Sequence, residues 1–117
     1  MEIKTSKQNS TQLIQIIGNL DSNSVNQAQE VILPLLSEKS SMVLDLEGCN
    51  YISSAGLRLL LMTAKQLSTQ GGVLVLSGLN DEIKDVMEIT GFSHFFQTFV
   101  NVEAAIEAIQ KEGSCSG

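Results

Sequence analysis

Two short apolar runs limit the folds open to this chain of 117 residues. Residues 42–46 read Met-Val-Leu-Asp-Leu, and residues 73–76 read Val-Leu-Val-Leu. A continuous apolar run of this length is typical of a strand that helices cover on both faces, as in a parallel sheet. Between the runs, residues 54–69 carry apolar side chains at helical spacing, and two glycines follow shortly after. This order predicts a right-handed strand–helix–strand crossover within a mostly parallel sheet.

The rest of the chain alternates between strands and helices in the same way, which predicts a single α/β domain. A short polar turn joins the first two strands, so we expect them to pair antiparallel at one side of the sheet. Helix starts are marked by serine and asparagine residues that suit N-cap positions. The additional strands are expected at residues 3–7, 13–17 and 95–100, and the additional helices after caps at Ser22 to Ser24, Asn80 and Asn101.

Acidic residues outnumber basic ones by 13 to 7, which gives a formal net charge of −6. This balance argues against nucleic acid and anionic membranes as partners and favours a basic protein surface. No apolar run approaches the length that spans a bilayer, and residues 1–10 are polar, so we expect neither a membrane span nor a secretory signal. The two cysteines, Cys49 and Cys115, fit a reducing compartment, and we expect a cytoplasmic protein.

The sequence lacks the residue types and spacings that are typical of metal sites, catalytic serines and phosphate-binding loops. His94 is the one histidine, and the cysteines lack metal-ligand spacing, so we expect no metal site. The serine pair at positions 53 and 54 lacks the first glycine of a nucleophile elbow. The pair Gly71-Gly72 is typical of a turn rather than of a phosphate-binding loop. We therefore predict a protein with no enzymatic activity and no cofactor.

The segment 51–58, Tyr-Ile-Ser-Ser-Ala-Gly-Leu-Arg, places two serines where the exit loop of a strand meets the start of a helix. A helix N-terminus offers free backbone N–H groups and a positive dipole end, and both suit an anion. A phosphate on either serine would be compatible with the fold, and we expect the N–H groups of Gly56 and Leu57 to face it. Local sequence by itself favours helix capping for the serines and a turn or cap role for Asp21.

The helix that follows the serines has a mixed outer face. With its stripe of leucines turned inward, Arg58 and Met62 fall on the outward side and Leu59 lies at the flank. Scattered apolar residues are common on surfaces, so these side chains are compatible with an ordinary solvated face. They are equally compatible with a small partner-binding face beside the serines.

Five segments spread along the chain form a recognisable set: Gly18-Asn19-Leu20-Asp21, Val43-Leu44-Asp45-Leu46, Tyr51–Leu57, Gly71-Gly72 and Ile89-Thr90-Gly91-Phe92. Together they resemble the anti-sigma factor antagonist family, the stand-alone STAS domains, and the serine loop is the specific part. The resemblance implies a STAS-type α/β domain over residues 1–112, followed by a flexible tail at 113–117. It further implies a mixed, mostly parallel sheet of about four or five strands, packed with about four helices.

The resemblance also implies a phosphorylation site. In the family the loop reads Asp-Ser-Ser/Thr-Gly-Leu, and the serine after the aspartate, here Ser54, is phosphorylated. Ser53 stands at the aspartate position and Ala55 at the second hydroxyl position, which leaves Ser53 as the rival acceptor. The acidic residue that family members use near the acceptor corresponds to Asp21. We expect the partner to contact this acid, the serine loop and the outer face of the next helix: Asp21, Ser53, Ala55, Gly56, Arg58, Leu59 and Met62.

The mechanism that the resemblance implies is partner switching. The unphosphorylated protein binds an anti-sigma factor, which is also a serine kinase with a histidine-kinase-like ATPase fold, and a sigma factor is freed. The kinase then phosphorylates the serine, the complex separates, and a PP2C-type phosphatase resets the system. Such a protein is a substrate and a binding module, expected as a monomer or weak dimer. The alternative within this fold is a scaffold subunit of a stressosome-like or lipid-transport complex, which predicts stable assemblies.

Overall fold

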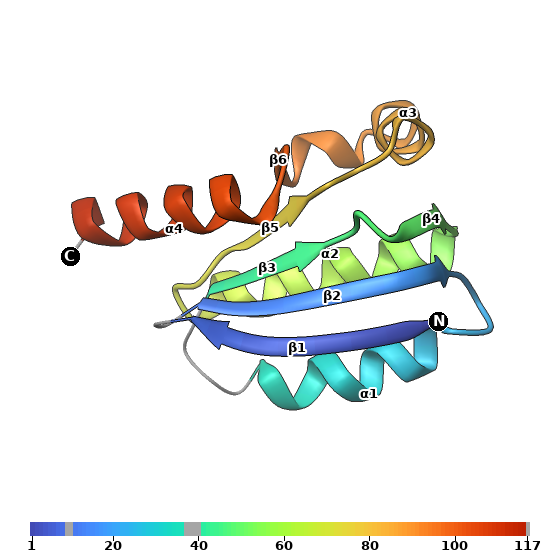
Figure 1. The fold of residues 1–117 in the computed structure, drawn as a ribbon, viewed down its shortest axis with the longest axis horizontal. Helices are drawn as coiled ribbons and strands as arrows, with labels where there is room; N and C mark the ends of the chain where they lie inside the picture. The colour runs from blue at the N-terminus through green and yellow to red at the C-terminus, as the bar shows by residue number, and fades with distance from the viewer. Residues whose placement is uncertain (9–10, 37–40, 117) are drawn as a thin grey trace.

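Strands and helices alternate along the chain (Figure 1), of which the computed structural model describes residues 1–8, 11–36 and 41–116. The strands are β1 (Glu2–Gln8), β2 (Thr11–Leu20), β3 (Ser41–Asp45), β4 (Cys49–Ile52), β5 (Leu74–Ser77) and β6 (Gln97–Phe99). The helices are α1 (Val25–Leu35), α2 (Ser54–Thr69), α3 (Asp81–Thr90) and α4 (Val102–Ser116), with a short 3-10 helix, η1 (Phe92–His94), after α3.

The strands form one mixed sheet. Five of them run side by side in the order β1-β2-β3-β5-β6, and β4 pairs with the last residues of β2, beyond the stretch that pairs with β3. The β1–β2 pair is antiparallel, and the other described pairs are parallel. The predicted α/β fold with a mixed, mostly parallel sheet is therefore confirmed, although the sheet has a sixth strand that the sequence did not predict. The predicted turn at residues 8–10 lies largely outside the described residues.

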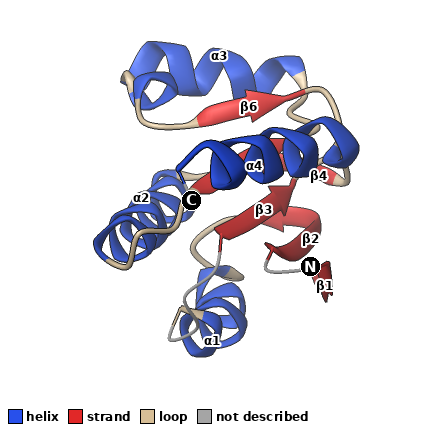
Figure 2. Cartoon of the chain, turned by 90° about the vertical axis from the view of Figure 1, so that its left-hand side faces the viewer, coloured by secondary structure: helices blue, strands red, loops and turns tan. Residues whose placement is uncertain are grey.

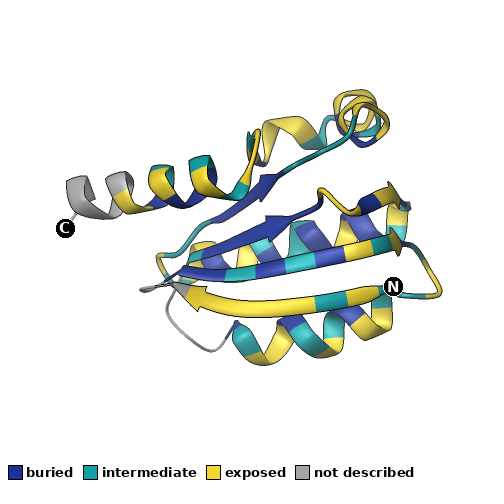
Figure 3. Cartoon of the chain, viewed as in Figure 1, coloured by how far each residue is buried: buried dark blue, intermediate teal, exposed yellow. Residues whose placement is uncertain are grey.

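Apolar side chains fill both faces of the sheet because successive residues of a strand point to opposite sides. Leu44 and Leu76 pack on the face that α1, α2 and α3 cover, and Figure 2 shows α1 and α2 together on one side of the strands. Val43 and Val75 pack on the other face, beneath α4. The strands β3 and β5 are buried along almost their whole length, as their apolar runs predicted (Figure 3).

Several element boundaries follow the predictions closely. Helix α2 begins at Ser54 and ends at Thr69, and Asn80 caps α3 by accepting the Ile83 N–H at 2.8 Å. The strand expected at 95–100 is shorter, because Phe95 is the C-cap of η1 and pairing with β5 covers Gln97–Phe99 alone. Helix α4 continues to Ser116, so that residues 113–116 of the predicted tail are helical; the flexibility of that segment stays a prediction. Among the described helices, none combines the length and the apolar character that a membrane span requires.

Candidate functional site

The serine loop is held in place by a close backbone approach between α2 and β2. Gly56, in the first turn of α2, is buried, and a Cβ atom there would lie 2.8 Å from the Leu20 carbonyl oxygen and 2.9 Å from Ile52 Cγ2. The same Leu20 oxygen accepts the Ser53 N–H at 2.9 Å. Only glycine permits this packing. The start of α2, the end of β2 and β4 therefore meet at one end of the sheet (Figure 1).

The two serines have different structural roles. Ser53 is the N-cap of α2, and its Oγ accepts the Gly56 N–H at 3.3 Å. Ser54 is the first helical residue and is exposed, and nothing in the described part of the chain hydrogen-bonds to its hydroxyl. The capping role that local sequence favours is thus confirmed for Ser53. Ser54 is the serine that presents a free hydroxyl to solvent.

The free backbone donors are not the ones that the sequence predicted. The Gly56 N–H is bonded to the cap, and the Leu57 N–H donates to the Ser53 carbonyl at 2.9 Å. The expectation that these two groups would face a phosphate is therefore wrong, because the N-cap side chain and the first helical hydrogen bond use them. The N–H groups of Ser54 and Ala55 have no acceptor among the described residues. These two groups, with the helix dipole, could bind an anion beside Ser54.

Asp21 shapes the loop that precedes α1. Its Oδ1 accepts the backbone N–H groups of Asn23 at 3.0 Å and Ser24 at 3.2 Å. The Ser24 hydroxyl closes the turn by donating to the Asn19 carbonyl at 2.7 Å while it accepts the Asp21 N–H at 3.0 Å. The local turn role of Asp21 is therefore confirmed. Because Asp21 directly follows Leu20, which Gly56 touches, its half-buried carboxylate also lies in the loop next to the serines.

The outer face of α2 is narrower than the sequence predicted. Arg58 is exposed and Met62 is half-buried, but Leu59 is only 4% exposed and belongs to the core. The placement of Leu59 on a partner-facing surface is therefore wrong. Helix α2 packs against α1 as well as the sheet, so its buried arc is wider than a sheet-facing stripe. Gly56, which the sequence also placed on this surface, is buried and packs closely against Leu20.

Tyr51 has no role in the site predicted from the sequence, yet its side chain is 50% exposed on β4, three residues before Ser54. The sequence feature that could have indicated its exposure is its position in a short segment without alternating apolar residues. In β4 the two inner residues, Asn50 and Tyr51, are exposed, whereas Cys49 and Ile52 at its ends are buried. An exposed aromatic residue beside a candidate modification site suits contact with another protein.

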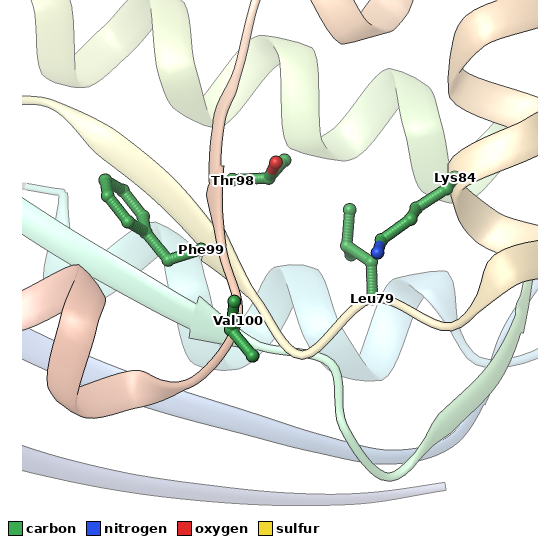
Figure 4. A pocket seen from close by; sticks show the side chains of 5 residues that line it. All are labelled: Leu79, Lys84, Thr98, Phe99 and Val100. Atoms are coloured by element: carbon green, nitrogen blue, oxygen red, sulfur yellow. The ribbon is translucent and has the colours of Figure 1, made fainter.

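The remaining chemistry-bearing residues lie apart from the serine loop or are inert. His94 is exposed in η1. Burial raises the pKa of the Cys49 thiol, although contacts with backbone of Tyr51 and Leu20 act in the opposite direction. Among the described residues, no three His, Cys, Asp or Glu side chains gather as a metal site requires. A shallow hollow of about 190 Å³ lies between the start of α3 and β6 (Figure 4), and its lining includes no serine-loop residue: Leu79, Lys84, Thr98, Phe99 and Val100.

Comparison with known proteins identifies the family. A model of the STAS domain matches residues 2–105. BtrV of Bordetella bronchiseptica, named as a candidate anti-sigma factor antagonist, is 46% identical over 69 residues, which are 59% of this chain and 60% of that protein. The anti-sigma-B factor antagonist of Staphylococcus aureus is 30% identical over 92 residues, 78% of this chain and 85% of that protein. The chain belongs to the STAS domain family and, within it, to the anti-sigma factor antagonists.

Solved structures agree on the fold. An anti-sigma factor antagonist from Mycobacterium paratuberculosis matches with a TM-score of 0.85 at 16% identity and covers 93% of both chains. SpoIIAA in its unphosphorylated form matches with a TM-score of 0.75 at 18% identity, over 93% of this chain and 98% of that one. The murine anion transporter Slc26a9 matches at 0.76 and 15% identity, over 91% of this chain and 18% of the transporter. The fold therefore serves different kinds of protein, and function has to be argued from the site.

The packing of Gly56 can be tested by adding one methyl group. We predict that Gly56→Ala lowers the free energy of unfolding by about 1–3 kcal/mol, because the new Cβ meets the Leu20 backbone, which cannot easily move. The control is Gly48→Ala, where the nearest atom to the new Cβ is Ile17 Cγ1 at 3.2 Å, so that a movement of a few tenths of an ångström relieves the contact. Urea unfolding measures both variants. Equal losses in the two would contradict the close approach.

The unequal roles of the serines give a second prediction. Ser53→Ala should lower the free energy of unfolding by about 1 kcal/mol, because it removes the cap from the Gly56 N–H. Ser54→Ala should change it by less than about 0.5 kcal/mol, since this hydroxyl has no partner among the described residues. Thermal unfolding of the two single variants side by side is the measurement. A larger loss for Ser54→Ala would mean that the cap is misassigned.

Proposed function

We propose that this protein is an anti-sigma factor antagonist that acts by partner switching, with Ser54 as its phosphoacceptor. The unphosphorylated form binds an anti-sigma factor, which is also a serine kinase of histidine-kinase-like ATPase fold. In the complex, Ser54 Oγ forms a bond to the γ-phosphorus of ATP, the bond from that phosphorus to the bridging oxygen breaks, and ADP and the hydroxyl proton depart. The phosphorylated form separates from the kinase, and a PP2C-type phosphatase hydrolyses the phosphate ester.

The observation that carries this proposal is the position of Ser54. Its hydroxyl is exposed at a helix N-terminus, and two free N–H groups stand beside it. Support comes from two relatives named as anti-sigma factor antagonists and from SpoIIAA, which has been solved in unphosphorylated and phosphorylated forms that match this chain with TM-scores of 0.75 and 0.72. In this function the protein is a cytoplasmic binding module and a substrate, without enzymatic activity or cofactor, and a monomer or weak dimer in solution.

Charge explains how one phosphate could separate the partners. A phosphoserine carries roughly −1.5 to −2 charges at neutral pH. In the free protein, the N–H groups of Ser54 and Ala55 and the dipole of α2 favour that charge by up to about 2 kcal/mol. In the complex, the phosphate would have to be desolvated against a surface shaped for a hydroxyl, which costs several kcal/mol when the charge is uncompensated. Each 1.4 kcal/mol changes the affinity about tenfold. A cost of a few kcal/mol for desolvating the phosphate is therefore enough to separate the partners.

The contact surface that we propose for the kinase is built from the loop residues that remain at the surface. Ser53 and Ala55 flank the acceptor and are half-buried, as is Asp21 in the adjacent loop. Arg58 and Met62 extend the surface along α2. Leu59 and Gly56 are left out because both are buried.

Phosphopeptide mapping tests the acceptor. We predict that incubation with ATP and the purified serine-kinase anti-sigma factors of the host modifies Ser54, and that Ser54→Ala abolishes the modification while the thermal unfolding midpoint is kept. Ser53→Ala is the matched control and should still be modified, because it removes the helix cap but keeps the Ser54 hydroxyl. Phosphate found on Ser53 alone would overturn the assignment of Ser54.

A further inference from the structure

Tyr51 is the one tyrosine of the chain, and it lies at the surface next to the proposed acceptor. Its strand is well anchored on both sides. On one side β4 pairs with the last residues of β2. On the other side, the Asn80 amide Nδ2 donates to the carbonyls of Cys49 and Asn50, at 3.4 Å each. A half-exposed tyrosine on such a fixed strand is pre-organised for contact, because little backbone freedom is lost when it is covered.

Acidic residues lie on the segments that flank β4 on both sides. Asn80 is the N-cap of α3, so its bonds to β4 bring the first turn of that helix next to the strand. This turn carries Asp81 and Glu82, both exposed. On the opposite side, Asp21 follows the last residue of β2, which pairs with Ile52 of β4. The basic side chains on α2 and α3 are those of Arg58, Lys65 and Lys84, and all three are exposed.

We propose that the partner's contact surface extends from the serine loop across β4 to the first turn of α3, with Tyr51 as its anchor. This inference rests on the proposed function and names its main contact residue. Tyrosine suits the role because a large ring is covered at the cost of few rotatable bonds, while the hydroxyl keeps a hydrogen-bond partner. The outer face of α2 offers less, since Leu59 belongs to the core. The surface fits a partner with an apolar socket for the ring and basic residues around it.

Fluorine labelling gives a direct test because the chain has a single tyrosine. Growth on 3-fluorotyrosine yields a protein with one ¹⁹F signal, which comes from Tyr51. The probe is the unlabelled, full-length kinase that modifies the wild-type protein, and calorimetry on the same samples measures how much complex has formed. We expect the signal to shift or broaden in step with complex formation. A signal that stays unchanged when calorimetry shows saturation would overturn the anchor role.

Variants measure the size of the effect. Tyr51→Ala should weaken binding of the kinase at least about tenfold, and Tyr51→Phe should retain most of the affinity. The control is Ile89→Ala on α3, where the side chain is 85% exposed and lies outside the proposed surface, and the change should stay within about twofold. Thermal unfolding confirms that each variant is folded. Wild-type affinity in Tyr51→Ala would overturn this inference alone, whereas a wild-type protein that binds no kinase would overturn the proposed function and this inference together.

Two glutamates at equivalent helix positions test whether the acidic first turn of α3 contributes to binding. Glu82 and Glu103 are both exposed and both lie in the first turn of a helix, but Glu103 belongs to α4. Glu82→Gln should slow association with the kinase by about two- to threefold at low salt, because complementary charge mainly raises the association rate. Glu103→Gln should leave the rate unchanged. Stopped-flow measurements at two salt concentrations decide the matter, and equal effects of the two variants would remove α3 from the contact surface.

Discussion

The close approach of the α2 backbone to the last residue of β2 is the constraint on which the serine loop depends. Gly56 sits where any side chain would collide with the Leu20 carbonyl, and that carbonyl also accepts the Ser53 N–H. One residue of β2 thus fixes both the first turn of the helix and its cap. Since Asp21 comes next in the chain, the same contact brings the acidic loop beside the serines. A looser approach would leave the loop without a defined shape.

This arrangement gives the two adjacent serines, Ser53 and Ser54, different roles. Ser53 has a structural role, because its hydroxyl caps the start of α2, whereas the Ser54 hydroxyl has no hydrogen-bond partner among the described residues. A phosphate on Ser54 would meet donors that the structure already holds open, and it would need no change in the backbone to be accommodated. The proposed switch therefore changes the surface while the backbone around the serine loop, called the frame below, stays fixed. The strand β4, held between β2 and Asn80, belongs to that frame and carries Tyr51 into the same surface.

The sequence predicts the frame well and the surface less well. The strands β3 and β5, the span of α2 and the cap at Asn80 follow from local apolar runs and capping residues, which depend on nearby sequence. The strand β4 could not be predicted in this way, because its four residues show no alternation and it exists through pairing with β2. The burial of Leu59 depends on the packing of α1 against α2, which a helical wheel does not include. The free N–H groups belong to Ser54 and Ala55 rather than to Gly56 and Leu57, because the cap takes one donor and the first helical bond takes the other.

In the proposed function, phosphorylation of Ser54 changes the charge of a preformed site and leaves the fold unchanged. Backbone amide spectra of the uniformly labelled protein, recorded before and after stoichiometric phosphorylation at Ser54, test it most directly. We expect shifts confined to the serine loop, the Asp21 loop and the first turn of α2, with the largest at the amides of Ser54 and Ala55 that would face the phosphate. Shifts spread through the central strands β3 and β5 would contradict it, because they would mean that the phosphate drives a conformational change of the whole domain.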